Sequence, residues 1–184
     1  MKKRKLVESM EMALVVEPNI DIVTDNMISE WGGTPYAELS VLLAHLEYLK
    51  KVHHTHHWIS RADPFYGDHL LFSRLYEAAE AEIDMVAEKA IGMGTTSNVD
   101  LMLVTAQCFK MIQGYGATST IPQASDLARR SYQAEMTFLK ATSRLVECLK
   151  QCGRLTRGVD NMIAGIEDKH EGHVYLLKQR CLAL

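Results

Sequence analysis

The chain has 184 residues, a length that suits one domain. Hydrophobic residues make up 47% and charged residues 23%, which is ordinary for a soluble globular protein. The formal net charge of −3 excludes a strong overall positive field of the kind that attracts nucleic acid.

The chain starts with a short basic segment, MKKRK, which an apolar run follows. This order is typical of a secretory signal, but Glu8 and Glu11 interrupt the apolar run and no small-residue cleavage site is obvious. We therefore interpret the segment as a flexible tail or a short helix. Proline and glycine residues between positions 18 and 36 indicate connecting structure. We predict an N-terminal extension over residues 1–35 and a single domain over residues 36–184.

Apolar residues recur at helical spacing through the rest of the chain, and no stretch is rich in alternating β-branched residues. Four long helices joined by a long connection between the second and third predict an all-α protein with a ferritin-like four-helix bundle. A short apolar helix lies in that connection. The predicted ranges are about 36–59, 65–92, 99–113 (the short helix), 122–151 and 156–182.

Two pairs of possible metal ligands lie in and just before the second long helix. His57 and His69 are twelve residues apart, and Asp84 and Glu88 are one helical turn apart. Histidine and carboxylate together suit iron, zinc or manganese. However, His69 and Asp84 are about 22 Å apart on a straight helix, so the two pairs cannot hold one ion within one chain. A two-fold dimer with this helix antiparallel to its copy would join them.

The order HW, then FxxxHxxF, then DxxxE resembles the Dps family, the ferritin-like miniferritins that protect bacterial DNA in starvation. The resemblance covers roughly residues 35–180 and is strongest from His57 to Gly94. Trp58 follows the first histidine, as is common in the family. The resemblance implies an inter-subunit ferroxidase centre with four iron ligands: His57, His69, Asp84 and Glu88. It implies no catalytic residue beyond these metal ligands.

The resemblance also implies the activity, the assembly and the cellular place. Fe(II) would be oxidised by hydrogen peroxide or oxygen, with peroxide favoured, and ferric iron would be stored in a hollow dodecamer built from two-fold dimers. Such a protein is cytoplasmic, has no membrane partner and protects against oxidative stress. Some family members bind DNA through a lysine-rich extension. Four basic residues are few for that purpose, although repeated tails in a multimer would add avidity.

One position departs from the family pattern, because Ser73 stands where the family usually has an aspartate. A serine hydroxyl is a poor ligand for divalent iron, which weakens a second iron position. Two alternatives therefore stay open. One is a Dps-like shell with a degenerate iron site that acts as a structural or DNA-binding particle. The other is an ordinary helical-bundle binding module with an incidental histidine cluster.

Further histidines lie outside the family pattern. The sequence HHTHH places His53, His54 and His56 beside His57, and we interpret these three as solvated or supporting side chains. In the last helix Glu167 and His170 form a Glu-x-x-His pair, but the second helix has no matching pair. We therefore expect His170 and His173 to lie on a solvated or inter-subunit face.

The chain has four cysteines: Cys108, Cys148, Cys152 and Cys181. We interpret them as reduced, packed thiols of a cytosolic protein. Cys148 and Cys152, four residues apart at a probable helix end, are also compatible with a metal role.

Overall fold

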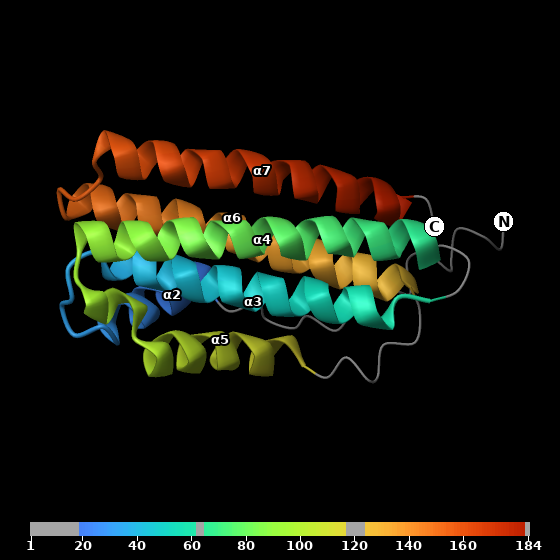
Figure 1. Cartoon of the computed structure of the whole chain (residues 1–184), viewed down its shortest axis with the longest axis horizontal. Coiled ribbons are helices and arrows are strands. Elements are labelled where there is room, and N and C mark those ends of the chain that lie inside the picture. The colour runs from blue at the N-terminus through green and yellow to red at the C-terminus, as the bar shows by residue number, and fades with distance from the viewer. Residues whose placement is uncertain (1–18, 62–64, 117–123, 183–184) are drawn as a thin grey trace, which may run out of the picture.

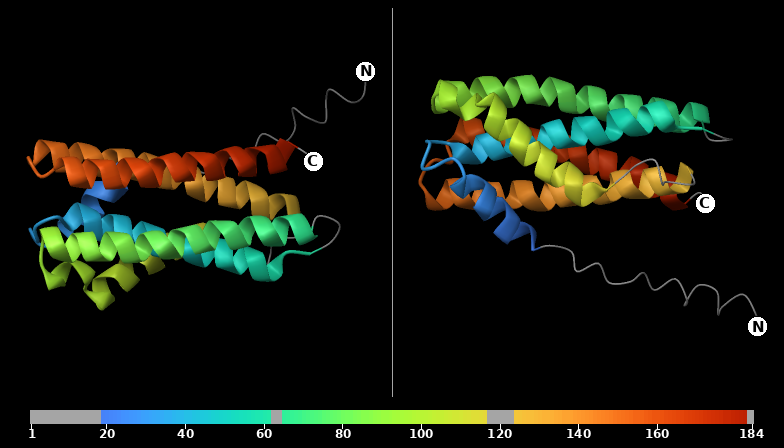
Figure 2. Two further views of the ribbon diagram at one scale, coloured as in Figure 1. Left: turned by 45° about the horizontal axis from the view of Figure 1, so that its top comes forward. Right: turned by 90° about the horizontal axis from the view of Figure 1, so that it is seen from below.

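The computed structural model describes residues 19–61, 65–116 and 124–182. Four long helices lie side by side in two layers, with α3 and α4 in one layer and α6 and α7 in the other (Figures 1 and 2). Helix α5 packs along α3, and α2 packs against α6 and α3. The elements are α2 (Ile20–Ser29), α3 (Ala37–Ile59), α4 (Phe65–Met93), the 3-10 helix η1 (Thr96–Val99), α5 (Leu101–Tyr115), α6 (Ala124–Gln151) and α7 (Arg157–Leu182).

The predicted all-α, ferritin-like four-helix bundle is confirmed, including the short helix α5 in the connection between α4 and α6. Each predicted helix boundary lies within two residues of the observed one. The predicted and observed helices agree because an apolar stripe at spacings of three and four residues is buried only when the backbone is helical. None of the helices in the described ranges is long and apolar enough to cross a membrane.

The expectation of connecting structure between residues 18 and 36 is wrong for α2. Trp31, just beyond this helix, is 4% exposed, and its indole Nε1 donates to Gln107 Oε1 on α5 at 3.3 Å. Gln107 Nε2 in turn donates to the Met27 carbonyl at 2.8 Å. Helix α2 is only ten residues long, and its periodicity is weak beside the turn residues that surround it. The basic first residues lie outside the described ranges.

Helix α3 is the centre of the core. All its side chains from Ala37 to Leu46 are buried, because α4, α5, α6 and α2 all pack against it. A helix that is enclosed on every side can be apolar all round. From the opposite layer, α6 contributes Phe138 and Leu145, and α7 contributes Ile163 to the same core.

Two bidentate ion pairs join helices that are distant in sequence. Arg180 on α7 donates to both carboxylate oxygens of Asp68 on α4, at 2.5 and 3.1 Å, and Asp68 is 1% exposed. Arg144 on α6 binds Asp25 on α2 in the same way, at 2.9 and 2.8 Å. The planar guanidinium matches the carboxylate in both pairs, which fixes orientation as well as charge. The four cysteines are free thiols, but only Cys108 is buried, and the expected packing is wrong for Cys152, which is exposed.

We predict that His45 makes the fold sensitive to acid. Burial lowers the pKa of its imidazole to about 4, against about 6.5 in an unfolded chain. Between these values the unfolded chain binds a proton that the folded chain does not, so stability falls as the pH drops through this window. Between pH 7 and pH 5, the unfolding free energy should fall by about 2 kcal/mol because of His45.

Denaturant unfolding of the wild type and of His45→Leu, each at pH 7 and pH 5, measures this effect. The variant should lose less of its unfolding free energy on acidification, because leucine does not titrate. An equal loss in both proteins would show that His45 is not the group responsible.

Candidate metal centres

His57, near the end of α3, and His69, near the start of α4, form a tightly built pair. Their rings stack with centroids 3.7 Å apart and an angle of 23° between the planes. His57 Nδ1 lies 3.0 Å from the His69 carbonyl oxygen, and His69 Nδ1 lies 3.1 Å from the His57 carbonyl oxygen. Because a carbonyl only accepts, each Nδ1 is the protonated nitrogen and donates. In the neutral ring, each Nε2 then keeps a lone pair for a metal.

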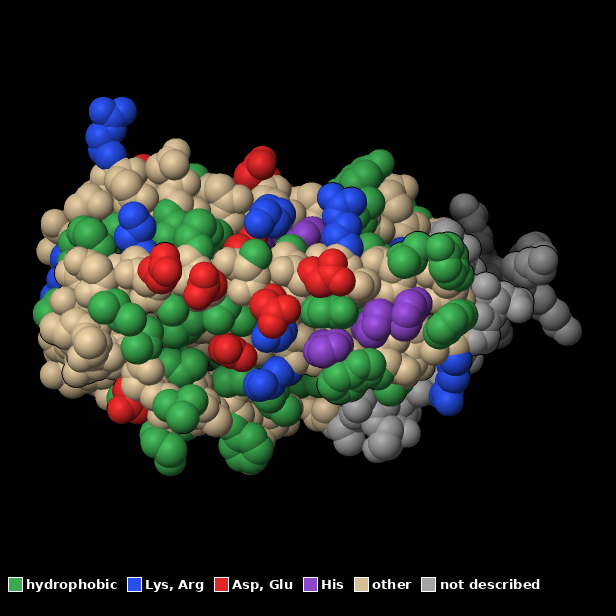
Figure 3. Space-filling model, viewed as in Figure 1, with side chains coloured by type: hydrophobic (Ala, Val, Ile, Leu, Met, Phe, Trp, Pro, Cys, Tyr) green, Lys and Arg blue, Asp and Glu red, His purple; other side chains and the backbone are tan. Residues whose placement is uncertain are grey.

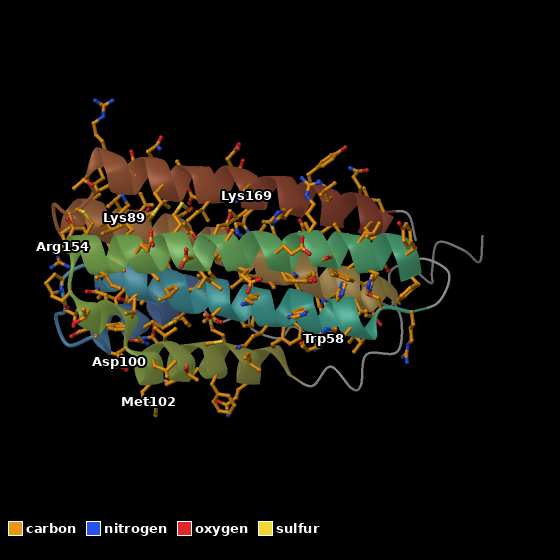
Figure 4. All side chains as sticks on the ribbon, in the orientation of Figure 1. Trp58, Lys89, Asp100, Met102, Arg154 and Lys169 are labelled. Atoms are coloured by element: carbon orange, nitrogen blue, oxygen red, sulfur yellow. The ribbon has the colours of Figure 1, made fainter. Side chains whose placement is uncertain are left out.

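Aromatic side chains surround this pair, which we call the His57–His69 pair. Tyr76 packs edge-on against His57 with ring centroids 5.3 Å apart, and Phe65 lies 5.1 Å from His69. Trp58, which follows His57 in the sequence and is labelled in Figure 4, lies at the surface with 67% of the residue exposed. Neither Nε2 has a hydrogen-bond partner among the described residues. The pair is therefore held in place and still able to bind.

Asp84 and Glu88 lie one turn apart on α4, and both are exposed. Helix α4 is unbroken from Phe65 to Met93, so His69 and Asp84 are about 22 Å apart along its axis. The structure thus brings His57 to His69, and does not bring this pair to Asp84 and Glu88 within the chain. Histidine and acidic side chains gather on the same outer side of α3 and α4 (Figure 3). The shared site stays a prediction.

Ser73 has a partner of its own on α4. Its hydroxyl donates to Glu77 Oε1 at 2.8 Å, one turn further along the helix. The serine therefore adds no negative charge beside His69, and its hydroxyl hydrogen is already donated to Glu77.

A second cluster, which we call the bundle cluster, lies inside the four-helix bundle around Glu135 of α6. Helix α3 contributes His53, whose Nε2 is 2.8 Å from Glu135 Oε1. Helix α7 contributes His170, whose Nδ1 is 2.5 Å from Glu135 Oε2, and His173, whose Nδ1 is 3.5 Å from Glu135 Oε1. Helix α4 contributes Glu82, whose Oε2 is 2.8 Å from His170 Nε2. All five residues are at most 2% exposed.

The bundle cluster extends in both directions. On one side, Lys169 Nζ forms an ion pair with Glu82 Oε1 at 2.8 Å and connects the cluster to the surface (Figure 4). On the other side, Ser131 Oγ lies 3.2 Å from His53 Nδ1 and 2.7 Å from His56 Nδ1. His56 Nε2 then contacts the Tyr115 hydroxyl. A continuous chain of polar groups therefore crosses the bundle from α7 to α5.

The acidic groups of the bundle cluster are held in their charged form. Burial alone raises the pKa of the Glu135 carboxyl, but its interactions with the neighbouring histidines, above all the hydrogen bond with His170, outweigh burial and keep this pKa well below its usual value. Glu82 shows the same balance, with His170 and Lys169 lowering its pKa. Burial lowers the pKa of His170, but the two carboxylates outweigh it and raise this pKa to about 9.

No family model and no curated protein matches the sequence. Solved structures do match the fold. Dps from Staphylococcus aureus is similar with a TM-score of 0.66 and 19% identity, over 78% of this chain and 92% of that one. The chain has the fold of Dps proteins. A Dps protein from Bacillus brevis is similar with the same TM-score and 16% identity, over 85% of this chain and 95% of that one.

A third similar structure connects the Dps fold with metal binding. Dps from Vibrio cholerae has a TM-score of 0.58 and 13% identity, over 86% of this chain and 91% of that one. It is described as a member of a broad superfamily of ferritin-like diiron-carboxylate proteins. At these identities the likeness establishes the fold of our chain. Within the described residues, the one group of three or more side chains close enough to share a metal is Glu135, His170 and His173.

Our expectation of solvated positions is wrong for four histidines, because His53, His56 and His170 are completely buried and His173 is 2% exposed. The inter-subunit face expected for His170 and His173 is wrong as well, whereas a supporting role of His53 and His56 stays a prediction. In the Dps fold these side chains continue the apolar stripes that form the bundle core. On α7 the buried positions 163, 166, 170, 173 and 177 keep spacings of three and four residues, and on α3 positions 46, 49, 53 and 56 do the same.

The carboxylates that sequence analysis missed follow the same rule. Glu135 lies between the buried Ser131 and Phe138 of α6, at spacings of four and three residues. Glu82 lies between the buried Ala79 and Val86 of α4. A glutamate at a position where the apolar stripe of a helix continues was therefore the sequence signal that could have identified Glu82 and Glu135 as buried.

We predict that Glu135→Ala lowers the unfolding free energy by about 3 kcal/mol, because it leaves His53 and His170 buried without their acceptor. Urea unfolding of chelator-treated protein measures this change. The exposed carboxylate Glu147 on the same helix supplies the control, since Glu147→Ala should cost less than about 0.5 kcal/mol. Equal small losses in both variants would show that the cluster does not hold the helices together.

Proposed function

We propose that the protein is an iron-sequestering ferroxidase of the Dps type, which oxidises Fe(II) and stores the ferric product in a hollow shell. Iron would bind between His57 and His69 of one subunit and Asp84 and Glu88 of a second copy. The observation that carries this proposal is the reciprocal anchoring of the two imidazoles, each by the other's backbone carbonyl. Anchoring of this kind orients histidines that bind metals.

The ligand chemistry supports oxidation as well as binding. Imidazole nitrogen and carboxylate oxygen suit iron, and anionic oxygen stabilises Fe(III) more than Fe(II). Two Fe(II) ions each lose one electron, and one hydrogen peroxide with two protons takes up both electrons to give two waters. This stoichiometry releases no hydroxyl radical. The exposed Trp58 beside His57 is placed to take up a stray oxidising equivalent.

The outer face of α3 and α4 supports a two-fold interface. Besides the four proposed ligands, this part of the chain exposes large apolar side chains, which are costly to leave in water. In an antiparallel two-fold pairing of α4 with its copy, residues near the start of the helix face residues near its end. The exposed apolar residues are Trp58 (67%), Phe65 (45%), Tyr66 (73%), Leu70 (50%), Met85 (41%) and Ile91 (41%). We propose that such dimers build a dodecamer.

An anaerobic Fe(II) titration followed by peroxide tests the activity. We expect saturable binding and rapid peroxide-dependent ferric absorbance in the wild type, with a rate lower by roughly tenfold or more in Glu88→Ala. Glu147→Ala removes another exposed carboxylate, from α6, and should behave as the wild type. Equal, slow oxidation in all three proteins with intact assembly would favour the alternative, a shell with a degenerate iron site that acts as a structural or DNA-binding particle.

Complementation tests whether two subunits share the site. His69→Ala and Glu88→Ala chains are each expected to oxidise Fe(II) at least roughly tenfold more slowly when alone, since every site lacks one ligand. Randomly mixed dimers of the two chains restore one complete site in each heterodimer, which is about a quarter of all sites. Co-expression of the two tagged chains and measurement of the oxidation rate give this fraction. No recovery in verified heterodimers would contradict a shared site.

A further inference from the structure

We infer that each subunit also holds a divalent transition metal inside its own four-helix bundle, bound by Glu135, His170 and His173. This site is distinct from the interface site, and it needs no second copy because all its ligands come from α6 and α7 of one chain. The inference does not rest on the proposed ferroxidase activity.

The donor set has the composition and spacing of a metal site. One ligand atom from each of the three side chains lies within 4.8 Å of the other two. Two imidazoles with one carboxylate match the ligands of non-haem Fe(II) sites and of zinc sites with an open position. Nitrogen ligands disfavour calcium and magnesium, which prefer oxygen. His53 Nε2, at 2.8 Å from Glu135 Oε1, is in reach as a further nitrogen ligand.

The surroundings of His170 are those of an oriented ligand. With Nε2 donating to Glu82 Oε2 at 2.8 Å, the lone pair of the neutral ring is on Nδ1, which faces Glu135. A carboxylate behind the imidazole fixes its tautomer and raises its basicity toward a metal. Lys169 balances the charge of Glu82 from the surface side.

His173 distinguishes a metal site from a simple network of hydrogen bonds. In a network without metal, protonated His170 bridges Glu82 and Glu135 and gives each carboxylate one charged hydrogen bond. His173 Nδ1 is then left without a hydrogen bond, because it is buried and its contact with Glu135 Oε1, at 3.5 Å, is too long and poorly aligned to be one among the described residues. A buried polar group without a hydrogen bond destabilises the folded protein. A metal ion in contact with His173 and Glu135 supplies the missing partner.

The test uses the full chain, and separate substitutions remove the ligands of the interface site and those of the bundle site. In the double variant His69→Ala, Glu88→Ala, which removes ligands of the interface site, we expect one tightly bound Zn²⁺ per subunit by equilibrium dialysis. Zinc should also raise the thermal unfolding temperature of this variant. Co²⁺ should give the visible absorption bands of a low-symmetry site with nitrogen ligands.

Two further substitutions in that background remove the inferred ligands independently. Glu135→Gln keeps the shape of the side chain, and His173→Asn leaves Glu135 and His170 in place, so either can carry the test if the other fails to fold. Each should weaken zinc binding by at least roughly tenfold. Glu38→Gln is the matched control, because Glu38 is also a buried carboxylate, 2% exposed and paired with Arg154 on the chain after α6. It should bind zinc as before.

Two results would overturn the inference. One is the absence of bound zinc and cobalt in the double variant. The other is unchanged binding and an unchanged cobalt spectrum in a folded His173→Asn protein. Either would assign the bundle cluster to hydrogen bonding alone. Loss of peroxide-dependent iron oxidation in the double variant concerns the interface site and leaves this test unaffected.

Discussion

The buried carboxylate of Glu135 is the interaction on which the arrangement of the bundle depends. A charge without access to water must be paired and hydrogen-bonded, or its burial costs several kcal/mol. Its partners come directly from α3 and α7, and His170 extends the connection to Glu82 on α4. The four helices can satisfy this group only at one axial level and one rotation. The apolar stripes above and below then meet in register.

The unbroken length of α4 keeps the possible ligands on the outer face of the bundle apart. Along one straight helix, side chains fifteen positions apart cannot converge, however suitable their chemistry. The bundle gathers its histidines and carboxylates from separate helices within a chain, whereas the outer face carries two separate pairs, His57 with His69 and Asp84 with Glu88. A centre formed from those pairs requires association of two subunits, so its metal affinity is linked to assembly. The bundle cluster carries no such linkage.

Sequence patterns predicted the helices well because an apolar stripe with helical spacing can be buried only if the segment is a helix. They also identified His57, His69, Asp84 and Glu88 as ligand candidates, and the structure brings the two histidines together. The bundle cluster escaped prediction because polarity was taken to mean exposure. Which stripe carboxylate meets which histidine depends on the rotation and axial level of four helices. Those are tertiary properties, and no single helix encodes them.

The histidine run of α3 contributes to two separate groups of side chains, the His57–His69 pair and the bundle cluster. Residues three apart share a helix face, so His53 and His56 both point into the bundle and contact Ser131, while His54 and His57 lie on the outer side. His53 and His57 are about 6 Å apart along the helix axis. Helix α3 therefore carries one member of the bundle cluster and one member of the His57–His69 pair on adjacent turns.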